Sequence, residues 1–271
     1  MNIKFTISYD GSRYQGWQRL KDSDKTIQGK IEAVLEKLSG QFIEIDGSGR
    51  TDAGVHALGQ VANFHIEEDL LIKGLESADV SCFEGLGKKE KADTCRRLRC
   101  YMNHYLPEDI RILKVETVSD RFHSRLHATA KWYRYRIGIG DVHDVFSRKY
   151  VYHISEKPDL EKMKLAAEYL KGTHDFLSFS ALKKTKKSTV RTITDITITQ
   201  SEKEIYIDYK GDGFLYHMVR ILTGTLLEIG LGKREVEDID RIFEKGLREH
   251  AGYLVPAKGL CLMEVSYRSK N

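Results

Sequence analysis

ITDITITQSEKEIYIDY, residues 193–209, consists of two runs in which apolar and polar residues alternate, separated by a short polar turn. Alternation with period two is typical of half-buried strands. Strands joined by so short a turn lie antiparallel in a sheet. The chain is therefore predicted to contain a mainly antiparallel sheet.

Strands and helices alternate on either side of this pair. The patterns predict further strands over residues 3–9, 42–45, 60–66, 110–117, 131–139 and 260–267, and helices over 26–38, 160–170, 217–229 and 236–245. Thr26 is the predicted N-cap of the first helix. The charged stretch at about 78–98 has a poor pattern and is interpreted as an insertion.

Each half of the chain thus alternates strands with helices and ends in a strand. This order indicates an α+β protein of two ferredoxin-like α/β subdomains, residues 1–122 and 123–271, that share a central, mainly antiparallel sheet. A cleft is expected between the subdomains.

The composition excludes several classes of protein. With 271 residues, 41% hydrophobic and 31% charged, the chain can bury a core and is not wholly disordered. No run approaches the roughly 18 apolar residues of a membrane helix, and the N-terminus has no signal-peptide pattern. With only four cysteines as well, we expect a cytoplasmic protein with no membrane partner.

The net charge of +4 permits a polyanionic partner without requiring one. One stretch is rich in basic residues: Lys183, Lys184, Lys186, Lys187 and Arg191. It is interpreted either as a solvated loop or as a loop that contacts phosphates. Cys95, Cys100 and His104, with Cys82, match no common zinc spacing, so no metal is predicted.

The densest group of reactive side chains is the glycine-rich loop at residues 47–56, which carries Arg50, Thr51, Asp52 and His56. A tight turn held by Asp52 and Thr51 is one interpretation. A phosphate-binding loop is a less favoured interpretation, because the Gly-Lys-Ser/Thr ending of the Walker motif is absent. The third interpretation is a nucleophilic carboxylate, Asp52, activated beside a cation.

Arg220 is the candidate cation, because it lies in an otherwise apolar stretch and a buried charge needs a partner. A structural ion pair elsewhere is the alternative. Tyr133 and Tyr135 share one face of their predicted strand. Tyr133 could stack on a base, whereas core packing is favoured for Tyr135 and Trp17.

The segment GRTDAGVHALGQVANF, residues 49–64, resembles the central motif of the tRNA pseudouridine synthase A (TruA) family. Further blocks match in order along nearly the whole chain: YDGS at 9–12, GWQ at 16–18, TIQ at 26–28, LP at 106–107, FHSR at 122–125, YRY at 133–135, DF at 175–176, GFLYHMVR at 213–220 and GL at 259–260.

This resemblance implies an enzyme that isomerises uridine to pseudouridine in the tRNA anticodon stem-loop, at positions 38 to 40, without cofactor or metal. Asp52 would be the catalytic residue, attacking the nucleotide or acting as a base. Tyr133 would stack on the uracil, and Arg220 would pair with Asp52. Arg50 would hold the flipped nucleotide, with the active site in the cleft.

His56 is a further expected substrate-binding residue, and Arg125 and the basic run would contact phosphates. The resemblance also implies a homodimer. The chain departs from the family at the longer 78–98 segment, at Trp132, at residues 188–191 and at Cys261, which affects the choice of RNA. A paralogue acting on ribosomal RNA, a non-catalytic RNA-binding module and a small-molecule hydrolase are the alternatives.

Overall fold

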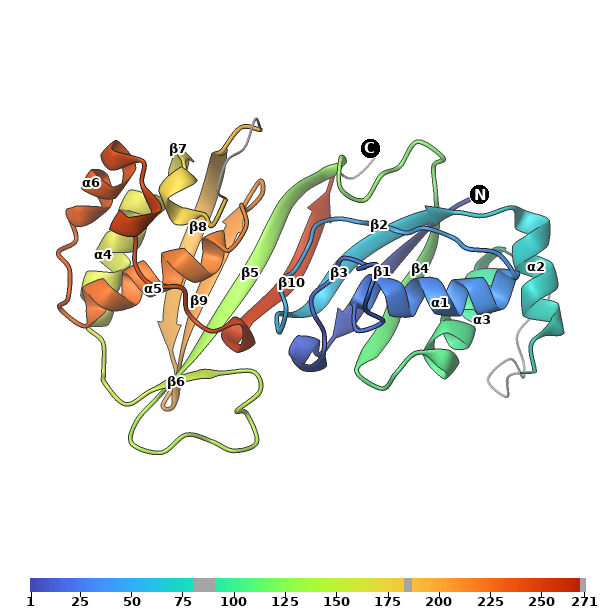
Figure 1. The fold of residues 1–271 in the computed structure, drawn as a ribbon, viewed down its shortest axis with the longest axis horizontal. Helices are drawn as coiled ribbons and strands as arrows, with labels where there is room; N and C mark the ends of the chain where they lie inside the picture. The colour runs from blue at the N-terminus through green and yellow to red at the C-terminus, as the bar shows by residue number, and fades with distance from the viewer. Residues whose placement is uncertain (80–90, 183–186, 269–271) are drawn as a thin grey trace. The chain divides into compact units, whose positions relative to one another are not determined.

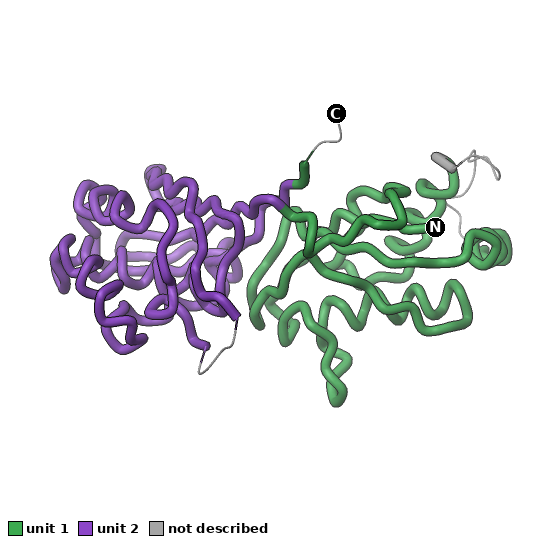
Figure 2. Tube along the Cα trace, turned by 90° about the horizontal axis from the view of Figure 1, so that it is seen from above, with its two compact units in different colours: residues 1–128, 267–271 green, residues 129–266 purple. Residues whose placement is uncertain are grey.

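The computed structural model describes residues 1–79, 91–182 and 187–268 (Figure 1). The chain divides into two compact units. Unit 1 comprises residues 1–128 and 267–271, and unit 2 comprises residues 129–266 (Figure 2). Each is an α+β arrangement with a mostly antiparallel sheet, so the predicted fold class is confirmed. The ferredoxin-like subdomains and the cleft stay predictions.

In unit 1, β1 (Asn2–Tyr9) lies between β3 (His56–His65) and β4 (Ile110–Val118) and is antiparallel to both. The short β2 (Asp46–Gly47) extends this sheet beside β3. The helices α1 (Ile27–Ser39), α2 (Glu68–Ser77) and α3 (Lys91–Tyr105) pack against one another. Phe5 and Phe64 meet edge to face in the core, with ring centroids 5.1 Å apart.

The last residue of the final strand, Tyr267, belongs to unit 1. Its hydroxyl donates a hydrogen bond to the carbonyl of Ser124 at 2.7 Å. Its ring lies 5.2 Å from that of Phe122. Unit 1 is therefore assembled from both ends of the chain.

In unit 2, β5 (Ala128–Ile139) is flanked by β10 (Leu260–Tyr267) and β9 (Glu204–Gly211), with β8 (Val190–Gln200) and β7 (Gly172–Asp175) beyond β9. β6 (Tyr152–Ile154) pairs parallel with the end of β5. α4 (Leu160–Leu170) packs on α5 (Met218–Gly230) and β8, and α6 (Asp238–Lys245) packs on α4. Single turns of 3₁₀ helix occur at Gly11–Arg13, Leu177–Phe179, Arg248–His250 and Ala257–Gly259.

The hairpin predicted over residues 193–209 is confirmed, because β8 and β9 pair antiparallel with Ile198 opposite Ile207. The Thr26 N-cap is also confirmed, since its side chain accepts a hydrogen bond from the N–H of Gly29. Trp17 and Tyr135 are core residues as predicted, with 2% and 0% of their surface exposed.

The strand predicted over residues 42–45 is wrong. Ile43 and Ile45 are buried, but the backbone of Ile45 bonds to side chains of α1 rather than to a neighbouring strand. The helix α2 was not predicted, and α3 was missed because its apolar face is weakly patterned. Residues 80–90 of the interpreted insertion lie outside the described residues, while 91–98 form the first half of α3. In the described part of the chain, no helix is long and apolar enough to span a membrane.

Candidate active site

The loop that carries Asp52 connects β2 to β3 and is fastened to β3 at its start. The Ser48 N–H donates to the carbonyl of Val61 at 2.7 Å, and the Ser48 hydroxyl donates to Gln60 Oε1 at 2.6 Å. Gln60 Nε2 in turn donates to the carbonyl of Gly49 at 3.0 Å. Two backbone positions ahead of Asp52 are thereby fixed to the sheet.

The residues next to Asp52 are held from the other side by β1 and the segment that follows it. The carbonyl of Thr51 accepts a hydrogen bond from the Trp17 N–H at 3.0 Å, and the Thr51 hydroxyl lies 2.8 Å from that of Tyr9. The turn closes through the backbone carbonyl of Asp52, which accepts from the Val55 N–H at 3.1 Å. The Asp52 side chain is half-buried at the edge of this fixed turn.

His56 connects the loop to the turn after β1. Its Nδ1 accepts a hydrogen bond from the Gly11 N–H at 3.1 Å, and the residue is buried. The same nitrogen lies 3.2 Å from a carboxylate oxygen of Asp10. The hydrogen bond from Gly11 gives His56 a structural function in the loop, and its predicted substrate binding stays a prediction.

Arg50 is exposed and begins a chain of side-chain hydrogen bonds that runs into the core. Its Nε donates to Gln18 Oε1 at 2.9 Å, and Gln18 Nε2 donates to Gln28 Oε1 at 2.7 Å. Gln28 Nε2 then donates to Glu32 Oε1 at 2.8 Å. We call these three acceptor residues the Gln18–Gln28–Glu32 chain.

The inner end of this chain is a buried carboxylate. Glu32 is only 2% exposed, and burial raises its pKa, against the opposing hydrogen bonds from the Ile45 N–H and Gln28. Arg19 Nε lies 2.9 Å from Glu32 Oε2 and supplies the nearby positive charge, although without hydrogen-bond geometry. Arg50 is therefore anchored, through two amides, to a group in the interior.

The Gln18–Gln28–Glu32 chain was not predicted from the sequence. A signal was present, because Gln28 and Glu32 lie four residues apart on a predicted amphipathic helix, next to its apolar positions. A polar pair at that spacing beside a buried face indicates an internal hydrogen-bond network.

In unit 2, Tyr133 and Tyr135 lie on one face of β5, as predicted, and both are buried. Tyr133 packs edge to face against Phe214, with ring centroids 5.3 Å apart. On the opposite face, Arg134 and Arg136 form two-point ion pairs with carboxylates of β9, with N–O distances of 2.8 Å.

Arg220 lies in the first turn of α5. The residue just before this helix, His217, is in the left-handed conformation (φ 64°). The Nε of Arg220 donates to the carbonyl of Val255 at 2.9 Å. The Tyr135 hydroxyl donates to the next carbonyl, that of Pro256, at 2.6 Å. Burial raises the pKa of Tyr135, so its hydroxyl stays a donor. The segment at 255–256 thus fixes the guanidinium of Arg220.

The predicted phosphate contacts are less fully described. Arg125 is exposed, and its backbone N–H donates to His123 Nδ1. Lys187 is exposed, and Arg191 donates to the carbonyls of Ser188 and Val190. The remaining residues of the basic run, Lys183, Lys184 and Lys186, lie outside the described residues. Within residues 1–79, 91–182 and 187–268, no group of three or more His, Cys, Asp or Glu side chains could hold a metal ion.

Comparison with known proteins assigns the family. A family model described as tRNA pseudouridine synthase matches residues 6–125 and 166–268, which is most of the chain. The chain belongs to the tRNA pseudouridine synthase family. The predicted resemblance is therefore confirmed, and the loop around Asp52 lies within the first matched region.

Individual members of the tRNA pseudouridine synthase family align over almost their full length. "tRNA pseudouridine synthase A" of Bacillus sp. (strain KSM-64) is 45% identical over 98% of this chain and 99% of its own. "tRNA pseudouridine synthase A 2" of Bacillus cereus (strain ATCC 14579) and "tRNA pseudouridine synthase A" of Clostridium kluyveri are each 42% identical, with the same coverage. A solved structure, "Crystal Structure of a Cbf5-Nop10-Gar1 Complex", matches 83% of this chain and 45% of that one at 12% identity and a TM-score of 0.34.

Proposed function

We propose that this protein converts uridine to pseudouridine in tRNA, with Asp52 as the catalytic residue. The observation that carries the proposal is the loop at residues 47–56, in which hydrogen bonds from three directions fix the backbone around one half-buried carboxylate. Such a fixed carboxylate is what covalent or base catalysis at a sugar carbon needs. Membership of the tRNA pseudouridine synthase family adds the substrate class.

The reaction breaks the bond between C1′ and N1 of uridine and forms one between C1′ and C5 of the same base. Asp52 either attacks C1′ and is displaced when C5 bonds there, or removes the C2′ proton to give a glycal and returns that proton to C2′ when C5 bonds to C1′. The uracil then turns, C5 bonds to C1′, the C5 proton leaves to solvent, and N1 takes up a proton. Because a stacked stem hides C1′ from a carboxylate, the nucleotide must be flipped out first.

The other predicted residues have corresponding functions in this proposal. Tyr133 stacks on the uracil, Arg220 keeps Asp52 ionised, and Arg50 holds the flipped nucleotide. The target is the anticodon stem-loop at positions 38 to 40, bound by a homodimer in the cytoplasm. Arg125 and the basic run contact RNA phosphates. No cofactor or metal takes part in the steps.

Release of tritium from C5-labelled uridine tests the proposal, with tRNA and ribosomal RNA transcripts assayed side by side. We expect release from tRNA alone. Release from ribosomal RNA alone would keep the chemistry and replace the substrate. Binding of RNA without release from either would contradict the proposal and favour a non-catalytic RNA-binding module.

Uncoupling Arg50 from the interior is expected to slow the reaction. Gln18→Leu removes the acceptor that Arg50 Nε uses at 2.9 Å, so the guanidinium is no longer oriented. We expect kcat/KM for tRNA to fall about ten-fold, the scale of one charge-assisted hydrogen bond. Kinetic measurements on Gln18→Leu, Arg50→Gln and the double variant check this.

The two substitutions should be non-additive, because both break the same contact. The double variant is therefore expected to be no slower than Arg50→Gln. Fully additive losses would mean that Gln18 acts independently of Arg50. Lys37→Gln, an exposed change on α1 outside the Gln18–Gln28–Glu32 chain, serves as the control.

A further inference from the structure

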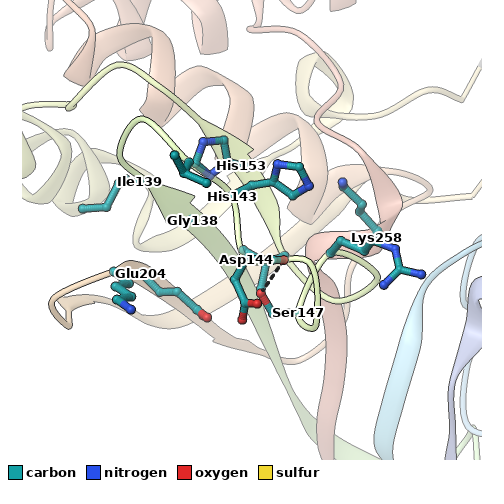
Figure 3. Close-up of a pocket in the computed structure, with 12 residues that line it drawn as sticks. Gly138, Ile139, His143, Asp144, Ser147, His153, Glu204 and Lys258 are labelled. Carbon is teal, nitrogen blue, oxygen red and sulfur yellow. Dashed lines mark hydrogen bonds between the residues drawn. The ribbon is translucent and has the colours of Figure 1, made fainter.

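Unit 2 contains a pocket of about 460 Å³ whose lining includes neither Tyr133 nor Arg220. Its walls come from the end of β5, the following segment at 142–153, the turn between β8 and β9, and the short helix before β10 (Figure 3). The volume falls within the range of about 300–1,000 Å³ that is usual for ligand pockets. None of the site residues that were predicted from the sequence lines this pocket.

A glycine keeps one wall of the pocket in place. Gly138 pairs with His153 across the parallel β5–β6 ladder. A Cβ at position 138 would lie 3.1 Å from Val151 Cγ1 and 3.3 Å from His153 Nδ1. A side chain there would therefore push against the imidazole, so the position of His153 depends on the absence of one.

Two imidazoles give the pocket an aromatic surface. The rings of His143 and His153 lie with centroids 5.8 Å apart and planes inclined by 56°. Figure 3 shows the two side chains near each other in the pocket. Val142 and Val151 add apolar surface beside them. A flat heteroaromatic ring can pack against such a surface.

The charges that line the pocket leave a positive excess. Glu204 is held by Arg136 through two contacts of 2.8 Å. Asp144 accepts the Phe146 N–H at 2.9 Å, which lowers the pKa of its carboxyl, and Lys203 lies near enough to lower it further. Lys258 and Arg148 also line the pocket, and neither makes an ion pair with another described residue, although Arg148 donates a hydrogen bond to the carbonyl of Val145.

We propose that this pocket binds one nucleotide of the RNA substrate, with the base against His143 and His153 and the phosphate against Lys258 and Arg148. An aromatic surface next to cations that form no ion pair is the combination that binds single-stranded nucleic acid. The inference rests on the proposed function, because that function makes RNA the ligand.

The nucleotide in the pocket is not the one that reacts. Tyr133 precedes Gly138 by five residues on β5, which corresponds to roughly 16 Å along a strand. Positions five residues apart also lie on opposite faces of a strand. The pocket therefore adds a second point of attachment within unit 2 for a strand of RNA.

Equilibrium binding of a tRNA transcript, measured over a range of KCl concentrations, tests the pocket. Lys258→Gln should weaken binding about five-fold and reduce the slope of log K against log [KCl] by about 1, because one phosphate contact is lost. The double variant His143→Ala, His153→Ala should weaken binding about ten-fold with an unchanged slope, because stacking does not release counterions. Lys157→Gln, an exposed lysine outside the pocket, should leave both quantities unchanged.

Tritium release by the same proteins separates this inference from the proposed function. We expect the pocket variants to raise KM and to leave kcat within about two-fold of wild type. An inactive wild type would contradict the proposed function. An active wild type with tRNA binding unaffected by the variants would overturn the pocket alone. Histidine NMR shifts on adding uridine 5′-monophosphate, with unchanged tRNA binding, would also overturn it, because the pocket would then serve a free nucleotide.

Discussion

Asp52→Asn abolishes tritium release from tRNA, with a fall in kcat of more than about 1,000-fold. The amide has nearly the same size as the carboxylate but no negative charge, so it is neither a nucleophile nor a base. The contacts described above that fix the loop use the backbone of residues 48–55 and the side chains of Tyr9, Ser48, Thr51, His56 and Gln60. The variant should therefore keep the loop in place and lose only the chemistry.

The controls for this substitution separate chemistry from folding. The thermal midpoint and the affinity for tRNA should stay close to those of wild type. Asp69→Asn makes the same chemical change at an exposed position of α2 and should leave kcat unchanged. If Asp52→Asn kept more than about a tenth of the wild-type rate, another residue would carry the reaction.

Gly11→Ala is expected to disrupt the same loop through packing. A Cβ at position 11 would lie 2.0 Å from the carbonyl oxygen of Val55 and 2.7 Å from its carbonyl carbon. Backbone atoms cannot move aside cheaply, so either the turn at 11–13 or the loop at 52–56 must shift. We expect a loss of about 3 kcal/mol in the free energy of unfolding, at the upper end for overpacking. Denaturant unfolding measures this loss.

Tritium release should fall by at least ten-fold in Gly11→Ala, because the shift also breaks the hydrogen bond from the Gly11 N–H to His56. Gly40→Ala is the matched comparison. That glycine has a positive φ of 73° but open space around its Cα, so its substitution tests backbone strain without a clash. It should cost about 1 kcal/mol and leave activity intact. If Gly11→Ala and Gly40→Ala changed the free energy of unfolding and the activity equally, the backbone around position 11 would accommodate the added Cβ without a clash.

Sequence patterns predicted those elements whose hydrogen bonds are local. The helix α4 has the bounds expected from its apolar spacing, because Asp159 caps its first turn and Met163, Ala167 and Leu170 recur on one face. The β8–β9 hairpin was predicted for the same reason, since alternation and a short turn define it within one segment.

The patterns failed where a distant side chain replaces a local partner. Residues 42–45 alternate as a strand does, yet the backbone of Ile45 bonds to Gln28 and Glu32 of α1. Local periodicity reports which residues are buried and does not report which atoms receive their hydrogen bonds. For the same reason, the Gln18–Gln28–Glu32 chain was not predicted, because it joins three separate positions in the sequence through side chains alone.

For the candidate site, the family motif identified Asp52 and its loop, because those residues are contiguous. The pocket at His143 and His153 could not be predicted, since it depends on a parallel pairing of β6 with β5 and on side chains from four segments. None of those segments carries a motif of its own.

The origin of unit 1 from both ends of the chain has a consequence for synthesis on the ribosome. Residues 1–128 emerge first, but the hydroxyl that bonds to Ser124 and the ring that packs on Phe122 belong to Tyr267, which follows Ser124 by 143 residues. The unit that bears Asp52 therefore completes these contacts only after residue 267 has left the ribosome. A fragment of residues 1–128 would keep the loop at residues 47–56 and lack both contacts of Tyr267.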